Sequence, residues 1–295
     1  MKGCTTEMKA LITGANGQLG TDLCHALASA EVIALTHTDV DITDLYAVKS
    51  VVSLHCPDVI INTAAYVRVD DCETQRDKAF KTNALGARNV AVAAQEAGSK
   101  LVQISTDHVF GGMERPKPTP YTEFDTPAPV NIYGMSKLAG EELVRSLCNR
   151  YFIVRTCGLF GVAGSSGKSG NFVETILKLA KKNNEVKVVC DQISSPSYTK
   201  DVAAIIAKLI TTEYYGFFHI VNSGTCSWFE FAKEIVGLAD LKAHVTPVSS
   251  DQYPQKARRP HYSALDNYHM RLLGMGEMRS WQEALRDYMI SKGHI

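Results

Sequence analysis

The fold of this chain is decided by the stretch Thr13-Gly14-Ala15-Asn16-Gly17-Gln18-Leu19-Gly20. It follows a strand-like apolar run at Lys9–Thr13 and opens a helical segment at Gln18–Ser29. Glycines at this spacing permit a tight turn, a close approach of backbone to a pyrophosphate, and close packing of the helix on the strand. The first amides of the helix would then face the phosphates. Such a triplet also occurs in ordinary strand-to-helix turns, but its place at the first β–α junction predicts a dinucleotide-binding site.

Apolar strand-like runs alternate with helical segments through the first half of the chain. The predicted strands are Lys9–Thr13, Glu31–Leu35, Val59–Asn62, Lys100–Ser105 and Tyr151–Arg155, and the predicted helices between them are Gln18–Ser29, Ala47–His55, Arg76–Ala97 and Tyr133–Cys148. Two of these strands are almost entirely apolar, which is typical of strands covered on both faces. The pattern predicts an α/β fold, a Rossmann-like doubly wound parallel sheet with a smaller C-terminal substrate-binding subdomain.

The second half is less regular. A glycine- and serine-rich loop spans Gly158–Gly170 and could act as a lid. A helix at Asn171–Lys182, a strand at Val186–Cys190, and helices at Lys200–Thr211 and Trp228–Ala239 are expected after it. We expect residues 1–155 to form the dinucleotide-binding domain, with returning segments near 186–215. Residues 156–185 and 216–295 should form the substrate-binding subdomain.

Composition limits the possible partners. The 295 residues contain 31 Lys and Arg and 31 Asp and Glu, so no overall charge would gather nucleic acid or an acidic membrane. Residues 1–10 lack an apolar leader and no run of eighteen apolar residues occurs, so we expect a cytoplasmic protein without membrane contact. The histidines and cysteines show no metal-ligand spacing, and no metal site is predicted. Monomer and homodimer both remain open.

The strongest chemical signal is Tyr133-Gly134-Met135-Ser136-Lys137, which places a phenol and an amine on one face of a helix. Reduction of a ketone needs a hydride at carbon and a proton at oxygen. A phenol with an ordinary pKa near 10 donates poorly unless a neighbouring ammonium lowers its pKa. Thr106, at the end of the Lys100–Ser105 strand, could hydrogen-bond the carbonyl and tune the phenol. Tyr133 could instead simply pack, with Lys137 as a solvated charge, but together with the glycine loop the spacing predicts catalytic roles for Thr106, Tyr133 and Lys137.

These residues together resemble the extended short-chain dehydrogenases/reductases, and among them the dTDP-4-dehydrorhamnose reductase family. The resemblance runs from about Met8 to the C-terminus. Beyond the motifs above, it is carried by Asp41-Ile42-Thr43, Asn62-Thr63-Ala64-Ala65-Tyr66, Asn171-Phe172-Val173, Trp228-Phe229-Glu230-Phe231-Ala232 and Arg258-Arg259-Pro260. The family reduces the 4-keto group of dTDP-4-dehydro-L-rhamnose to give dTDP-L-rhamnose, a sugar of bacterial surface polysaccharides.

The resemblance implies a set of site residues. The dinucleotide would be held by Gly14, Asn16, Gly17, Gln18, Leu19, Gly20, Asp41, Ile42, Ala64, Ala65 and Tyr66, with Tyr133 and Lys137 at its nicotinamide end. The dTDP-hexose would be held by Thr106, Asp107, His108 and Asn171, and its diphosphate by Arg258, whose planar guanidinium suits that role. For Arg259 a surface position is equally plausible.

The choice between NADPH and NADH stays open. The acid expected about 20 residues beyond the glycines is missing from the strand end, where Thr36-His37-Thr38 stands instead. Asp39 and Asp41 follow slightly later, and no Arg or Lys is adjacent to mark a 2′-phosphate.

Two departures from the family pattern keep other activities open. His108 stands where the family usually has Tyr, and Gly158 where it has Trp, so the sugar pocket loses aromatic surface unless Trp228 or the glycine-rich loop compensates. The substrate could therefore be a related nucleotide-linked 4-keto sugar. A dehydratase is disfavoured because His108 replaces the Glu of its Asp-Glu pair. An epimerase or a non-catalytic subunit, similar to the regulatory β subunit of methionine adenosyltransferase, remains an alternative on the same fold.

Overall fold

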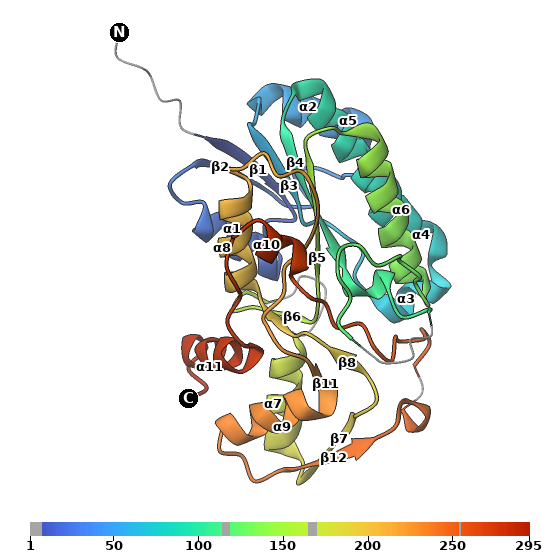
Figure 1. The fold of residues 1–295 in the computed structure, drawn as a ribbon, viewed down its shortest axis with the longest axis vertical. Coiled ribbons are helices and arrows are strands. Elements are labelled where there is room, and N and C mark those ends of the chain that lie inside the picture. Colours follow the sequence, from blue (N-terminus) through green and yellow to red (C-terminus); the bar gives the residue numbers. More distant parts are fainter. Residues whose placement is uncertain (1–7, 114–118, 165–169, 254) are drawn as a thin grey trace.

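A six-stranded parallel sheet forms the centre of the molecule. The computed structural model describes residues 8–113, 119–164, 170–253 and 255–295. The strands lie in the order β10-β5-β4-β3-β1-β2 (Figure 1). Their bounds are β1 Lys9–Thr13, β2 Glu31–Leu35, β3 Val59–Asn62, β4 Lys100–Thr106, β5 Tyr151–Thr156 and β10 Gly216–His219. The order reverses at β1, which lies between β2 and β3, as in a doubly wound sheet.

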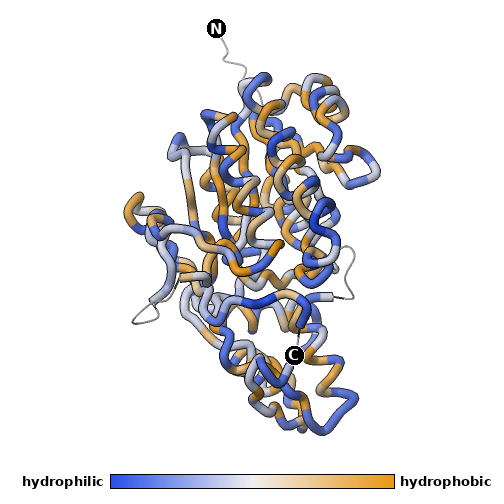
Figure 2. Tube along the Cα trace, turned by 90° about the vertical axis from the view of Figure 1, so that its right-hand side faces the viewer, coloured by the Kyte–Doolittle hydropathy of each residue, from blue (hydrophilic) through white to orange (hydrophobic). Residues whose placement is uncertain are grey.

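Alternation along the strands buries both faces of the sheet. In β1, Ala10 and Ile12 pack on one face, and Leu11 packs on the other. The strands β3, β4 and β5 repeat this division, so each strand contributes to two cores. The tube of Figure 2 shows apolar colour concentrated in the interior of the larger part of the molecule.

Helices cover both faces. On one side, α1 (Gln18–Ala26) packs against α8 (Thr199–Leu209); on the other, α2 (Leu45–His55), α5 (Ala87–Ala97) and α6 (Ile132–Leu147) lie side by side (Figure 1). The long helix expected at Arg76–Ala97 divides into α4 (Arg76–Phe80), a π-helical segment Lys81–Gly86, and α5. The short helix α3 (Val69–Thr74) precedes it, and α10 (Tyr268–Leu272) packs on β10.

A smaller part lies below the carboxyl ends of the strands (Figure 1). Its core is formed mainly by α7 (Phe172–Lys182), α9 (Trp228–Leu238), α11 (Trp281–Ser291) and the parallel pair β7 (Glu185–Val189) and β12 (His244–Val248). Short strand pairs join the parts: β6 (Leu159–Phe160) with β9 (Ser197–Tyr198), and β8 (Ile193–Ser194) with β11 (Cys226–Ser227).

The membership of two strands differs from the sequence-based division. We expected residues near 186 to return to the sheet, but β7 pairs with β12 in the smaller part. We expected residues 216–219 in the substrate-binding subdomain, but β10 extends the six-stranded sheet beside β5. Both are short apolar runs, and the pairing partner of such a run is set by tertiary packing.

The structure contains neither a membrane-spanning helix nor a cluster of metal ligands among the residues that it describes. Within the four described ranges, no helix is long and apolar enough to cross a bilayer. Among the same residues, no three His, Cys, Asp or Glu side chains gather as metal ligands.

Candidate active site

A cavity of about 630 Å³ opens at the carboxyl ends of the parallel strands. It lies where the loops after β1 and β3 diverge, the position at which open α/β sheets bind their ligands. Most of the residues expected at the site line it: Gly14, Asn16, Gly17, Gln18, Leu19, Gly20, Asp41, Ile42, Ala64, Ala65, Thr106, Asp107, His108, Tyr133 and Lys137. The fold thus brings the glycine loop and the Tyr-Lys pair to one space.

The glycine loop has room only for glycine at two positions. Gly14 has φ +70°, and a Cβ there would lie 2.8 Å from Thr63 Oγ1 and 2.9 Å from Ala64 N. A Cβ on Gly20 would lie 2.4 Å from the carbonyl oxygen of Gly14. Gly17 is the N-cap of α1, and no side chain caps that helix, so its first amides remain available to an anion. These features fit a dinucleotide pyrophosphate.

Asp39, the first acidic residue after β2, does not line this cavity. Asp39 accepts hydrogen bonds from the amide and the hydroxyl of Thr36, both at 2.7 Å, which lowers the pKa of its carboxyl. His37, which lines the cavity, stands closer to the strand end. Asp41 accepts a hydrogen bond from Thr43 N at 2.9 Å, and that bond lowers the pKa of Asp41.

The catalytic candidates come from β4 and α6. Asn131 caps α6 and places Tyr133 and Lys137 on its first turns. The Lys137 ammonium is buried and donates to the carbonyl oxygen of Ile104 at 2.6 Å. Thr106 ends β4, donates to Asp107 Oδ1 at 3.1 Å, and accepts from His108 N at 3.1 Å.

The electrostatics of the pair differ from the sequence-based expectation. Burial lowers the pKa of Lys137 to about 8, while Glu141 opposes that shift. We expected the ammonium to lower the pKa of Tyr133. In the structure burial raises the pKa of Tyr133 above 10, and a hydrogen bond with Thr106 only partly offsets this. The phenol is therefore protonated at neutral pH, as a proton donor must be.

A buried ion pair lies beneath these residues. The Glu141 carboxylate accepts from Arg155 Nη2 at 2.7 Å and from Arg155 Nε at 3.0 Å, and it also accepts from the Ser105 hydroxyl. The Arg155 guanidinium lies over the rings of Phe110 and Phe217, at 5.1 Å and 4.8 Å from their centroids. This network joins α6, β4 and β5 where they support the catalytic groups.

A second cavity of about 340 Å³ shares Asp107 and His108 with the first and extends into the smaller part. Phe172, Trp228, Tyr253 and Arg259 also line it. Ser263 holds Asp107 by donating to its Oδ2 at 2.6 Å. Trp228 lies beside Gly158, because a Cβ on that glycine would be 3.2 Å from Trp228 Cη2. Trp228 at the start of α9 thus places an aromatic ring next to Gly158.

Three expected residues lie outside both cavities. Tyr66 has its backbone bonded to Asn83 and its ring under the Lys78 ammonium, 4.9 Å from the centroid. Asn171 is the N-cap of α7, and its Nδ2 donates to Gln18 Oε1 at 3.1 Å. It therefore contacts a residue that lines the cavity without lining the cavity itself.

The third, Arg258, is exposed and lines neither cavity. Its neighbour Arg259 lines the second cavity, bonds Asp70 Oδ2 at 2.9 Å, and has a buried Nη1 without a hydrogen-bond partner. Sequence reasoning favoured Arg258 for the diphosphate, left Arg259 open between that role and a surface position, and missed Asn131 and Ser263. The only signal for the arginine was the Arg-Arg-Pro motif, which does not say which of the two arginines points inward.

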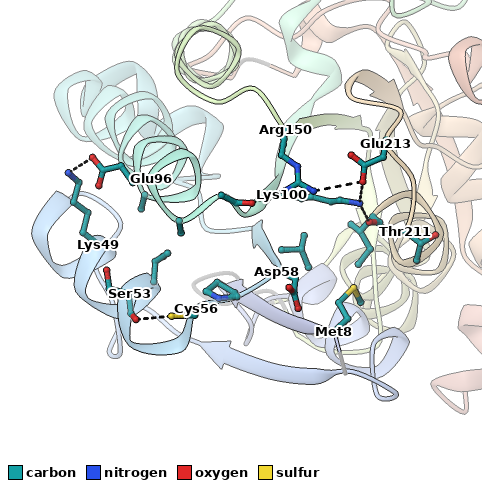
Figure 3. Close-up of a pocket in the computed structure, with 17 residues that line it drawn as sticks. Met8, Lys49, Ser53, Cys56, Asp58, Glu96, Lys100, Arg150, Thr211 and Glu213 are labelled. Carbon is teal, nitrogen blue, oxygen red and sulfur yellow. Dashed lines mark hydrogen bonds and ion pairs between the residues drawn. The ribbon is translucent and has the colours of Figure 1, made fainter. Parts of the chain in front are cut away.

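A further cavity of about 730 Å³ lies at the amino ends of the strands (Figure 3). Its charged side chains engage one another: Lys49 pairs with Glu96 at 2.7 Å, and Lys100 pairs with Glu213 at 2.8 Å. It contains none of the glycine-loop or catalytic residues and lies at the wrong edge of the sheet for a dinucleotide.

The fold and this site define an oxidoreductase of the short-chain dehydrogenase/reductase class, which uses a nicotinamide dinucleotide. The family model described as "RmlD substrate binding domain" matches residues 8–292, and the chain belongs to that family.

Several known proteins are similar to this chain over nearly its whole length. The crystal structure of dTDP-4-dehydrorhamnose reductase from Bacillus anthracis in complex with NADP is 47% identical, with a TM-score of 0.91 over 97% of this chain and 99% of that chain. The spore coat polysaccharide biosynthesis protein SpsK of Bacillus subtilis is 43% identical over 95% of this chain and 96% of its own length. The dTDP-4-dehydrorhamnose reductase of Mycolicibacterium smegmatis is 38% identical over 94% of this chain and 84% of its own length.

Proposed function

We propose that this protein catalyses the NAD(P)H-dependent reduction of dTDP-4-dehydro-L-rhamnose to dTDP-L-rhamnose. The observation that carries this proposal is the shared lining of the first cavity, where Thr106, Tyr133 and Lys137 meet the glycine loop. The second cavity joins the first at Asp107 and His108, so a ligand held there can reach the catalytic groups. The relatives named as dTDP-4-dehydrorhamnose reductases support the same substrate.

The chain supplies the proton for this reaction. The nicotinamide, when bound, supplies a hydride to the carbonyl carbon. Tyr133 is protonated, so its hydroxyl can give a proton to the carbonyl oxygen. The Thr106 hydroxyl assists Tyr133, because it hydrogen-bonds the phenol and can orient the substrate carbonyl. Lys137 brings a positive charge to the same wall of the cavity and favours the phenolate left by proton transfer.

The dinucleotide would rest on the first helix and the loops beside it. The amides of Gly17, Gln18 and Leu19 would bind its phosphates, and Ala64 and Ala65 would line the strand-end side. Since Asp39 does not line the cavity, no carboxylate at the end of β2 selects against a 2′-phosphate, and both NADPH and NADH fit.

The nucleotide sugar would occupy the second cavity. We assign its diphosphate to Arg259 rather than to Arg258, because Arg259 lines the cavity and Arg258 does not. Trp228 and Phe172 would supply aromatic surface. The part built on the six-stranded sheet thus binds the dinucleotide and the smaller part binds the sugar nucleotide. We place the reaction in the cytoplasm, where nucleotide sugars are made.

One assay tests the function. Purified protein should oxidise NADPH or NADH when the 4-keto sugar is generated in the same solution. Tyr133→Phe should abolish this turnover while dinucleotide binding persists, and Tyr214→Phe, at an exposed tyrosine outside both cavities, should not change it. Full turnover by Tyr133→Phe would refute the assignment of the proton donor.

A related 4-keto sugar is the second candidate. The observation that favours it is His108, which puts an imidazole where the family usually has a phenol. Comparing kcat/KM for two dTDP-linked 4-keto hexoses that differ in ring stereochemistry would decide between them.

A further inference from the structure

We propose that the side chain of Gln18 is a positioning group that couples the binding of the dinucleotide to the binding of the sugar nucleotide. The identities of both ligands rest on the proposed function, whereas the link between their sites rests on hydrogen bonds within the protein. Gln18 is the first residue of α1, directly after the N-cap Gly17, and it lines the first cavity. Its side chain bonds the segment that leads from β6 to α7.

Two donors set the orientation of the Gln18 amide. Gly161 N donates to Gln18 Oε1 at 2.9 Å, and Asn171 Nδ2 donates to the same oxygen at 3.1 Å. Exchanging the oxygen and the nitrogen of the amide would set donors against donors. The carbonyl end of Gln18 therefore faces Gly161 and Asn171, which follow it in the chain by 143 and 153 residues.

Asn171 connects this contact to α7. Its Oδ1 accepts from Glu174 N at 3.1 Å and so caps the helix, which leaves Nδ2 to face Gln18. The same Nδ2 also donates to the hydroxyl of Tyr288, a fully buried residue of α11, at 3.1 Å. The start of α7 is thus held by α1 on one side and by the core of the smaller part on the other.

The first turns of α7 form a wall of the second cavity. Phe172, Thr175, Ile176 and Leu179 line that cavity. The ring of Phe172 also lies against that of Trp228, with centroids 4.6 Å apart. A displacement of the start of α7 would therefore move side chains that we assign to the sugar nucleotide.

The close approach of α1 to this segment depends on a glycine. A Cβ on Gly161 would lie 2.1 Å from Thr199 Oγ1 and 3.2 Å from Gln18 Cβ. One turn further along α1, Asp22 accepts from the Thr199 hydroxyl at the start of α8. Gln18 and Asp22 lie on one face of α1, so this end of the helix cannot move without displacing the segment after β6.

These contacts place one side chain between two ligands. The phosphates of the dinucleotide would fix the first amides of α1, and with them the backbone of Gln18. An ordered Gln18 holds Gly161 and Asn171, and through them the start of α7. Because the first ligand has already ordered this wall, the second ligand loses less conformational entropy on binding. Each ligand should therefore raise the affinity for the other by the same factor.

The coupling can be measured with NADP⁺ and dTDP, which carries no sugar to oxidise. Calorimetric titration of dTDP into the wild type should show at least about fivefold tighter binding when NADP⁺ is present. In Gln18→Met, which keeps the length of the side chain but lacks the amide, this factor should fall below about twofold. Gln282→Met, at an exposed glutamine in the first turn of α11, should keep the wild-type factor. An unchanged factor in Gln18→Met would overturn the proposal.

Glutamate at position 18 provides a conservative rescue. Gln18→Glu keeps an acceptor oxygen for Gly161 N and Asn171 Nδ2, so the coupling factor should persist. The added negative charge beside the phosphates should weaken the binding of NADP⁺ itself. Loss of coupling in Gln18→Glu as complete as in Gln18→Met would refute a role for the acceptor oxygen.

Hydrogen exchange gives a readout that needs no sugar nucleotide. NADP⁺ alone should slow the exchange of the backbone amides of α7 in the wild type and in Gln282→Met, but not in Gln18→Met. A wild type that binds NADP⁺ without this protection would overturn the proposal.

The two proposals fail in different ways. A wild type that binds NADP⁺ but neither binds dTDP nor reduces the keto sugar would contradict the proposed substrate, while the exchange of α7 would still decide the role of Gln18. With turnover intact and NADPH saturating, Gln18→Met should raise KM for the keto sugar more than it lowers kcat. A fall in kcat alone would contradict a role in forming the second cavity.

Discussion

Removing the charge of Glu141 should destabilise the protein strongly. Its side chain is 0% exposed and that of its partner Arg155 is 3% exposed. The carboxylate receives Arg155 Nη2 at 2.7 Å and Nε at 3.0 Å, and Arg155 Nη1 already lacks a partner. Glu141→Gln preserves the volume but leaves the guanidinium without its counter-charge. Breaking a buried pair in this way costs about 3–5 kcal/mol, a large part of the roughly 5–15 kcal/mol that stabilises a folded protein.

Replacing both partners should be much less harmful. In Glu141→Leu/Arg155→Met neither charge of this pair remains, and the methionine can pack against Phe110 and Phe217, whose rings the guanidinium contacts in the wild type. Unfolding by guanidinium chloride, followed by circular dichroism, gives the free energy of each variant. We expect a favourable coupling of about 2 kcal/mol or more from the double-mutant cycle. Additive losses, or a Glu141→Gln variant within about 1 kcal/mol of wild type, would refute the reasoning.

Three other outcomes follow from the structure. Because the pKa of Lys137 is lowered to about 8, kcat should fall as pH rises through that value, and a profile flat to pH 10 would contradict a role for its charge. Burial lowers the pKa of His219 from 6.5 to about 3, so between these values the unfolded chain binds a proton that the folded chain does not bind. The free energy of unfolding should therefore fall as the pH drops below 6.5, and it should fall less in His219→Gln. Gly14→Ala, with φ +70° and a Cβ 2.8 Å from Thr63 Oγ1, should weaken NADPH binding at least about tenfold by fluorescence titration. Gly98→Ala, with φ +69° and no atom within 4 Å of its Cβ, is the control and should bind normally.

The sequence alone determined the order of the elements and the place of the dinucleotide loop. The five strands predicted in the first half begin at the expected residues. They were predictable because a sheet that is covered by helices on both faces requires strands that are apolar on both sides. Gly14 and Gly20 were predictable from local geometry, since Gly14 has φ +70° and a Cβ on Gly20 would lie 2.4 Å from the carbonyl oxygen of Gly14. The spacing of Tyr133 and Lys137 was equally local, because four residues are one turn of a helix.

Only the tertiary structure decided the surroundings of these groups. Ser263 reaches Asp107 across 156 residues, and Asn131 joins His108 to the Arg258 carbonyl across 23 and 127 residues. Arg258 and Arg259 are adjacent and chemically identical, so only packing reveals which side chain enters the cavity. The pKa of Tyr133 is raised rather than lowered because burial outweighs the hydrogen bond with Thr106. Local pattern fixes backbone conformation, whereas burial and long-range hydrogen bonds, which set the chemistry of a side chain, exist only in the folded chain.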